Sequence, residues 1–194
     1  MELKVLGIDP SLSNFGYAFG KYLDSTNSVE IDRVSVESPT IITSKQVRQN
    51  NKDLDRAQQL SNSLLDNLRA WEPDAVFIEV PVGSKSARAM ASYGICIGII
   101  ASAKHRTSVP FYEVTPTQVK LFVSGSKKAS KQEIIDWAVN KYPNVNWPYK
   151  VIKGQKSIIT GQAEHMADAV AAIHAGILNC NDFSNVLHFL RNRK

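Results

Sequence analysis

The sequence predicts an α/β fold with a mixed five-stranded sheet flanked by helices. Three observations predict it: residues 4–38 contain three strand-like segments, residues 52–71 switch to helical spacing, and residues 75–80 return to a compact apolar run. A sheet that begins with a three-strand meander and then adds strands through helical crossovers belongs to the α/β class.

The N-terminal meander consists of three segments. Residues 4–9 (KVLGID) are short and apolar, as in a buried strand, and residues 10–14 form a turn. Residues 15–22 (FGYAFGKY) alternate aromatic and small side chains, which favours the second strand of a hairpin. Residues 29–38 (VEIDRVSVES) alternate apolar and polar side chains, which predicts a third strand with one solvated face.

A crossover helix and a fourth strand follow. Apolar side chains recur at helical spacing through residues 52–71, and Pro73 ends the helix because proline cannot continue the hydrogen-bond ladder. Residues 75–80 (AVFIEV) are expected to form a strand parallel to the first one, since a helical crossover precedes it.

The next elements repeat this alternation. Residues 86–105 form a helix rich in small residues, and residues 110–114 (PFYEV) form a fifth strand. Thr115 or Thr117 caps a short helix that runs through residue 123. A further helix runs to about residue 141, capped by Ser130 with Glu133 in a capping box.

The C-terminal third contains the least regular segment. Residues 143–162 lack a clear period and are expected to form a loop or hairpin insertion. Residues 164–179 form a final helix, and residues 185–194 form a short basic tail that is helical at first. All of these elements are assigned to one domain, residues 1–194, because a chain of this length is typical of a single domain.

Composition excludes several classes of protein. The chain of 194 residues is 43% hydrophobic, has a net charge of +5, and contains two widely spaced cysteines and no CxxC pair, which disfavours structural zinc. No apolar run reaches the roughly 20 residues of a membrane span, and no signal peptide is recognised, so a cytoplasmic location is expected. The positive charge agrees with a nucleic-acid partner.

Three carboxylates stand in apolar surroundings. Asp9 ends the first strand before a turn, Glu79 lies in the apolar fourth strand, and Asp168 lies among small and apolar residues of the last helix. Such placement costs several kcal/mol unless the group is paired or bound to a metal. If the first and fourth strands are neighbours, Asp9 and Glu79 converge at the carboxyl edge of the sheet, where hard cations such as Mg²⁺ can relieve their repulsion.

Each carboxylate also has a purely structural explanation. Asp9 before a turn is a common cap, Glu79 at a strand end can reach solvent, and Asp168 can pair with a lysine. One helical turn before Asp168, both His165 and Glu164 lie near its face, and either is a candidate fourth ligand. The joint pattern, rather than any single residue, indicates a metal site.

The sequence resembles the RuvC family of Holliday junction resolvases through short blocks in family order. These blocks are Gly7-Ile8-Asp9-Pro10-Ser11, Gly16-Tyr17, Ile78-Glu79, the small-residue helix from Gly94 to Ala101, Thr115-Pro116-Thr117-Gln118-Val119-Lys120, Gly125, Lys131 and His165-Met166-Ala167-Asp168-Ala169-Val170. Together they cover most of the chain outside its loops.

The resemblance implies an RNase H-like fold, a homodimer, and paired nicks in four-way DNA junctions with two Mg²⁺ ions per active site, or Mn²⁺ in their place. The acidic positions of the family correspond to Asp9, Glu79, His165 and Asp168, and its two functional lysines correspond to Lys120 and Lys131. The resemblance therefore favours His165 over Glu164 as the fourth ligand, and implies that both lysines bind phosphate or stabilise charge beside the scissile bond.

Two departures from the family pattern concern substrate selection. The aromatic wedge that often follows the strand glutamate is absent from residues 80–83 (VPVG), and the segment 143–162 is longer than the usual connection. These departures are typical of a divergent member, such as one encoded by a bacteriophage. Without the wedge, strict selectivity for four-way junctions does not follow from the metal site.

Basic residues around these motifs are candidate DNA contacts. The assigned positions are Lys85, Arg88, Lys120, Lys127, Lys128 and Lys131. Lysines of the insertion, with Trp147 and Tyr149 beside them, also suit a distorted DNA backbone.

Three other functions remain open at this stage. A YqgF-like RNA-processing nuclease has the same fold, and a non-catalytic junction-binding protein needs no metal site. An actin-like kinase shares the first motif, although such enzymes have a second domain for which 194 residues leave no room.

Overall fold

The computed structural model describes residues 1–41 and 46–191. Its centre is a five-stranded sheet in the order β3-β2-β1-β4-β5. The strands are β1 (Glu2–Asp9), β2 (Phe15–Leu23), β3 (Ser28–Glu37), β4 (Ala75–Glu79) and β5 (Phe111–Val114). The first three strands pair antiparallel, whereas β4 and β5 are added parallel to β1. This mixed sheet confirms the predicted α/β class.

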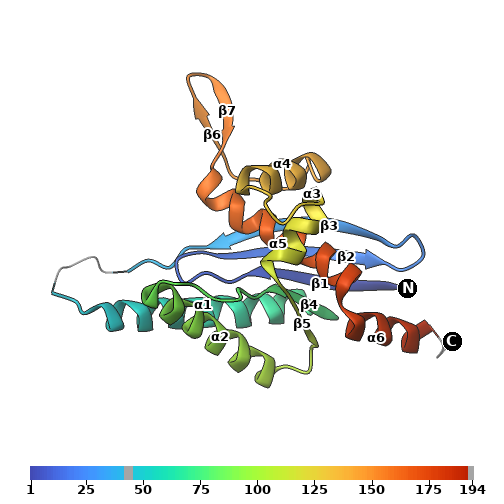
Figure 1. The fold of residues 1–194 in the computed structure, drawn as a ribbon, viewed down its shortest axis with the longest axis horizontal. Helices are drawn as coiled ribbons and strands as arrows, with labels where there is room; N and C mark the ends of the chain where they lie inside the picture. Colours follow the sequence, from blue (N-terminus) through green and yellow to red (C-terminus); the bar gives the residue numbers. More distant parts are fainter. Residues whose placement is uncertain (42–45, 192–194) are drawn as a thin grey trace.

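Helices cover both faces of the sheet (Figure 1). The pair α1 (Gln49–Trp71) and α2 (Ala87–Arg106) encloses one apolar core with the side chains of Leu6, Ile8 and Phe19. On the other face lie α3 (Pro116–Ser124), α4 (Lys131–Lys141), α5 (Thr160–Asn179) and α6 (Asn181–Arg191).

Helix α5 lies unusually close to the sheet because two strands carry glycine where they meet it. A Cβ atom on Gly7 of β1 would stand 2.0 Å from the carbonyl oxygen of Ala169, and one on Gly16 of β2 would stand 2.0 Å from that of His165. Any side chain at these positions would push the helix outward. The small residues of the two motifs therefore set the distance between the sheet and α5.

The C-terminal third differs in part from the sequence-based expectation. The segment 143–162 contains a two-stranded hairpin formed by β6 (Tyr149–Ile152) and β7 (Gln155–Ile158), after which α5 begins at Thr160. The start of the basic tail is helical, as predicted, and α6 is held in place because its Phe183 and Leu187 are buried in the core. The last three predicted tail positions, 192–194, lie outside the described residues. None of the described helices is long and apolar enough to cross a bilayer.

Candidate active site

Two of the predicted carboxylates meet at the carboxyl edge of the sheet. Asp9 is the last residue of β1 and Glu79 is the last residue of β4. The two strands pair in parallel, with Ile8 in register with Ile78, so the next residue of each strand emerges at the same edge. Ligands bind at this edge in open α/β sheets.

The N-terminal half of α5 brings His165 and Asp168 to the same place. The Nδ1 atom of His165 lies 2.6 Å from Oδ2 of Asp9, which is hydrogen-bond distance. Both side chains are 15% exposed, so this contact is largely shielded from water. The close approach of α5 at Gly16 explains how a helix residue reaches the end of β1.

Glu164, the reserve candidate for the fourth ligand, has a different partner. Its Oε2 atom pairs with Nζ of Lys131 at 2.8 Å, while its Oε1 atom is 3.5 Å from Nε2 of His165. Glu164 thus connects the start of α4 with the site, and His165 is the residue of the two that contacts Asp9 directly.

Glu79 is the most unusual group of the site. Its Oε2 atom is buried and has no hydrogen-bond partner among the described residues. Burial raises the pKa of Glu79 well above its usual range, and the charges of Asp168 and Asp9 raise it further. Burial also raises the pKa of Asp168, with a further increase from Asp9. The positive charges of Lys120, Lys131 and His165 lower these pKa values without outweighing burial, so the clustered carboxylates favour protons or a cation.

His165 responds to the same charges in the opposite sense. Burial lowers its pKa, but the hydrogen bond and charge of Asp9, together with the charges of Glu164 and Asp168, outweigh burial and raise the pKa above its usual value. In the absence of a cation, the imidazole is therefore favoured as a proton donor to Asp9.

Two lysines face the carboxylates from separate helices. Lys120 lies on α3, whose start is fixed by Pro116 and by a capping box between Thr115 and Gln118. Lys131 opens α4, whose own capping box joins Ser130 and Glu133. Glu164 raises the pKa of Lys131 through their hydrogen bond. Both lysines are therefore placed by helices with capped starts, Lys120 in the middle of α3 and Lys131 as the first residue of α4.

All six predicted catalytic residues line one hollow of about 420 Å³. Among the other lining residues, sequence reasoning did not single out two that carry a hydroxyl group, Ser11 and Tyr93. Ser11 was visible only as part of the first motif. Tyr93 is the sole Phe, Trp or Tyr of α2, and its position on a helix gave no indication that it faces the site.

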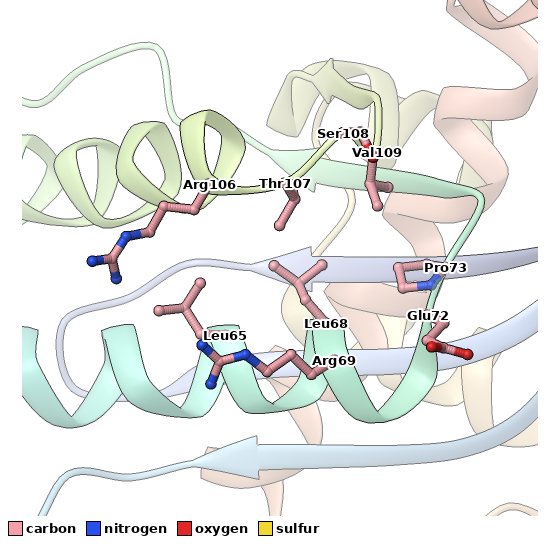
Figure 2. Close-up of a pocket in the computed structure, with 9 residues that line it drawn as sticks. All are labelled: Leu65, Leu68, Arg69, Glu72, Pro73, Arg106, Thr107, Ser108 and Val109. Atoms are coloured by element: carbon pink, nitrogen blue, oxygen red, sulfur yellow. The ribbon is translucent and has the colours of Figure 1, made fainter.

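A larger hollow of about 720 Å³ lies elsewhere, between the C-terminal ends of α1 and α2 (Figure 2). Leu65 and Leu68 form its floor, with Arg69 and Arg106 beside them, and Glu72 is its sole carboxylate. Without clustered acids, this hollow offers no chemistry like that of the smaller one.

The DNA-contact candidates are not equivalent in the structure. Lys85, Lys127 and Lys128 are exposed. Arg88 instead pairs with the buried carboxylate of Asp53, which also accepts from Gln49 and Arg56. This contact joins α2 to α1.

Trp147, considered with the basic residues of the insertion, is 5% exposed and donates from Nε1 to the carbonyl oxygen of Tyr142. The expectation of a DNA contact at Trp147 is wrong, because the ring is part of the core.

As the side chains stand, no group of three or more His, Cys, Asp or Glu residues within 1–41 and 46–191 is arranged to hold a metal ion. The donor set nevertheless fits a hard divalent cation. It combines carboxylate oxygens with one imidazole, and includes the buried, unpartnered oxygen of Glu79. A cation would stabilise the ionised forms of Glu79 and Asp168.

The fold and the clustered carboxylates define a nuclease of the RNase H-like class. The family model "Crossover junction endodeoxyribonuclease RuvC" matches residues 5–145. The chain therefore belongs to the RuvC family, whose members are metal-dependent nucleases, as the resemblance in the sequence predicted.

Individual relatives agree with this assignment. A RuvC from Desulforamulus reducens is 31% identical over 130 residues, which is 67% of this chain and 74% of the relative. A RuvC from Prochlorococcus marinus is 28% identical over 154 residues, covering 76% of this chain and 87% of the relative.

Two solved structures share the fold. The T. thermophilus RuvC in complex with a Holliday junction substrate matches with a TM-score of 0.63 and 21% identity, covering 89% of this chain and 92% of the other. The yeast mitochondrial Holliday junction resolvase Ydc2 matches with a TM-score of 0.58 and 18% identity, covering 98% of this chain and 84% of the other.

Proposed function

We propose that this protein resolves four-way (Holliday) DNA junctions, and other branched DNAs, by paired phosphodiester nicks. The observation that carries the proposal is the single hollow in which Asp9, Glu79, His165 and Asp168 face Lys120 and Lys131, in a chain of the RuvC family. The curated relatives are named crossover junction endodeoxyribonucleases, and one structural neighbour holds a Holliday junction substrate. A DNA substrate of this kind is expected in the cytoplasm of the host.

The proposed cofactor is Mg²⁺, with Mn²⁺ as a substitute and two ions per active site. Asp9, Glu79, His165 and Asp168 would hold these ions, because they supply oxygen and imidazole donors around an unpartnered carboxylate. When bound, such ions activate a water molecule and stabilise the leaving oxygen.

Residues around the proposed cation site would bind phosphate and regulate cation binding. Lys120 of α3 and Lys131 at the start of α4 both line the hollow and can attract and orient the scissile phosphate. The raised pKa of His165 favours an imidazolium in the metal-free site, and this group must lose one proton before its other ring nitrogen can bind a cation, so cation affinity should rise with pH. The exposed lysines Lys85, Lys127 and Lys128 would hold flanking phosphates, and Arg88 would act mainly through Asp53.

A panel of labelled substrates tests the proposal. We expect nicking of four-way junctions in Mg²⁺ or Mn²⁺ and none in EDTA, with much slower cutting of a linear duplex of the same sequence. Forks, flaps and three-way junctions in the panel define the breadth of branched substrates. Preferential cutting of structured RNA would instead support an RNA-processing nuclease, and tight junction binding without cutting would support a non-catalytic binding protein.

We also propose that α2 forms a homodimer interface, which would present two active sites to one junction. Its outward face carries exposed apolar and small residues, including Met90, Ala91, Ile97 and the glycine pair Gly94 and Gly98. Glycine costs a helix about 1 kcal/mol relative to alanine. A Cβ atom at either glycine would meet nothing within 4 Å, so packing within the chain does not explain them. Small residues allow two helices to approach closely, which favours a second copy as the occupant.

Gly98→Leu is expected to convert the dimer into a monomer without loss of folding, since the space around Gly98 is open within one chain. Sedimentation velocity measures the change. Asn62→Leu, at an exposed position of α1, adds the same side chain on another surface and should leave the dimer intact. A wild-type protein that is monomeric at micromolar concentration, with and without junction DNA, would exclude this interface.

A further inference from the structure

The β6–β7 hairpin projects from the body of the protein beside the start of α5 (Figure 1). Lys153 and Gly154 form its turn with φ angles of 50° and 81°, as two-residue hairpin turns with the twist of the strands require. The match with the RuvC family model ends at residue 145, before the hairpin begins. The hairpin is therefore not part of what that match shares.

Asn146 and Trp147 fix the base of the hairpin to the body, and one backbone hydrogen bond closes the base itself. The side-chain amide of Asn146 accepts from Val34 N at 2.9 Å and donates to Val34 O at 2.8 Å. Trp147 is buried, and Ile159 N donates to Pro148 O at 2.8 Å across the two strands. A hairpin held in this way keeps a defined direction relative to the sheet.

The upper part of the hairpin has apolar side chains that nothing in the chain covers. Val151 is 71% exposed and Ile152 is 46% exposed, and they occupy opposite faces of the strand just before the turn. An isolated two-stranded hairpin is marginally stable in water. An exposed apolar side chain on each face of the hairpin end suits an element that inserts between two surfaces of a partner.

The charge of the segment identifies the kind of partner. Lys150, Lys153 and Lys156 all lie on the hairpin, and no Asp or Glu occurs between Asp136 and Glu164. A basic, acid-free segment fits the phosphate backbone of nucleic acid. Lysines alone would suffice to bind phosphates, so the two apolar residues at the end require a second explanation. The apolar side chains can contact the faces of DNA bases, which are accessible only where the DNA is unstacked.

The hairpin is close enough to the active site to contact the same DNA. Its second strand leads directly into α5, and His165 follows within the first two turns of that helix. Four residues of β-strand extend roughly 13 Å. This length corresponds to about four base steps along one DNA strand.

We propose that the hairpin probes the branch point of the DNA, with Val151 and Ile152 against unstacked bases and Lys153 and Lys156 on the adjacent phosphates. This inference rests on the proposed function in branched-DNA cleavage. It gives the chain an element for opening the junction that does not depend on an aromatic residue after Glu79.

The test uses the full-length chain and a four-way junction that carries a fluorescent adenine analogue beside the branch point, in EDTA so that binding is measured without cutting. We expect wild-type binding to increase the fluorescence, because the analogue becomes unstacked. Val151→Ser with Ile152→Ser should lose most of this increase and bind the junction about tenfold more weakly, while duplex affinity changes little. A tenfold loss corresponds to about 1.4 kcal/mol, and burial of an aliphatic side chain of this size contributes on that scale.

A matched control replaces two exposed apolar residues away from the hairpin, Leu54→Ser with Leu178→Ser, which are 69% and 68% exposed. This control should behave as wild type. A second hairpin variant, Lys153→Gln with Lys156→Gln, should reduce the slope of log affinity against log salt by about two. Its control is Arg69→Gln with Arg106→Gln, which removes the same charge at the larger hollow.

The possible outcomes separate the two proposals. If wild-type protein does not prefer junctions to linear duplex, the proposed function fails. If it does, and both hairpin variants match wild type in fluorescence, affinity and salt slope, only the hairpin inference is overturned. A hairpin variant that changes the oligomeric state but not DNA binding also overturns it, because the exposed residues would then contact a protein.

Discussion

Asp9→Asn is expected to reduce nicking of a four-way junction by at least about a hundredfold, while junction affinity stays within a few-fold of wild type. Replacing a residue that only hydrogen-bonds to a metal ligand reduces activity by up to about a hundredfold. Replacing a proposed ligand itself should therefore reduce activity at least as much. Asp9 ends β1 at the hollow and contacts His165, and therefore stands at the centre of the proposed cation site. Asparagine keeps the shape of the side chain but removes its charge.

Junction binding should survive because the basic residues that we propose to contact phosphate lie on other elements. Lys120 is on α3, Lys127 and Lys128 precede α4, and Lys131 opens it. The affinity of the variant is expected to be equal to or slightly higher than that of wild type in EDTA, since one negative charge near the DNA is removed.

The measurement compares single-turnover nicking rates in Mg²⁺ with binding measured in EDTA. Asp66→Asn is the matched control, because Asp66 is 75% exposed on α1 and its loss removes the same charge. The control should nick at the wild-type rate. Near-normal nicking by Asp9→Asn would show that the active site has been assigned to the wrong residues.

The fold and the position of the carboxylates followed from patterns that are local in the sequence. Asp9 and Glu79 each end an apolar strand, and parallel pairing of those strands was sufficient to bring them to one edge. Helical spacing placed His165 near the face of Asp168. These inferences needed periodicity and topology but no knowledge of side-chain contacts.

Contacts between distant residues were not predictable in the same way. Nothing local to Arg88 indicates that it pairs with Asp53, 35 residues earlier in the chain. Trp147 lies among polar residues and lysines, so its sequence context suggested a surface position, whereas the ring packs into the core. Only the folded arrangement of α1, α2 and α4 determines these partners.

The buried carboxyl group of Glu79 is the basis of the second prediction with a large expected effect. Glu79→Gln is expected to stabilise the metal-free protein while abolishing nicking. The glutamate has a buried oxygen without a partner, and ionised Asp168 and Asp9 oppose its charge. Glutamine keeps the shape of the side chain, removes the charge, and offers an amide that can donate to those carboxylates. Relief of one unsatisfied buried group is worth about 1–3 kcal/mol. Each kcal/mol raises the unfolding midpoint by roughly 2–4 °C in a protein of this size.

The effect should depend on pH with a defined sign. Burial and nearby charges raise the pKa of Glu79 and of Asp168 in the folded state, whereas unfolded carboxyl groups titrate near about 4. Their contribution to stability is therefore complete below that pH and is lost as the pH rises through the folded-state pKa values. Metal-free wild-type protein should lose stability between pH 6 and pH 9, roughly the range over which such raised groups ionise, and added Mg²⁺ should restore it.

Thermal unfolding in EDTA at pH 6 and at pH 9 measures the difference in stability between Glu79→Gln and wild type, over roughly the range in which the raised groups ionise. Glu79→Gln should have the higher midpoint, and the gap between variant and wild type should widen as the pH rises. Glu113→Gln is the control, because Glu113 lies on β5 in register with Ile78 and faces solvent, so its neutralisation relieves no burial. A midpoint for Glu79→Gln at or below that of wild type at pH 9 would mean that Glu79 is stabilised by contacts other than those described. If the variant is instead more stable and inactive, the site maintains its carboxylate cluster at the expense of folding stability, as a cation-binding site requires.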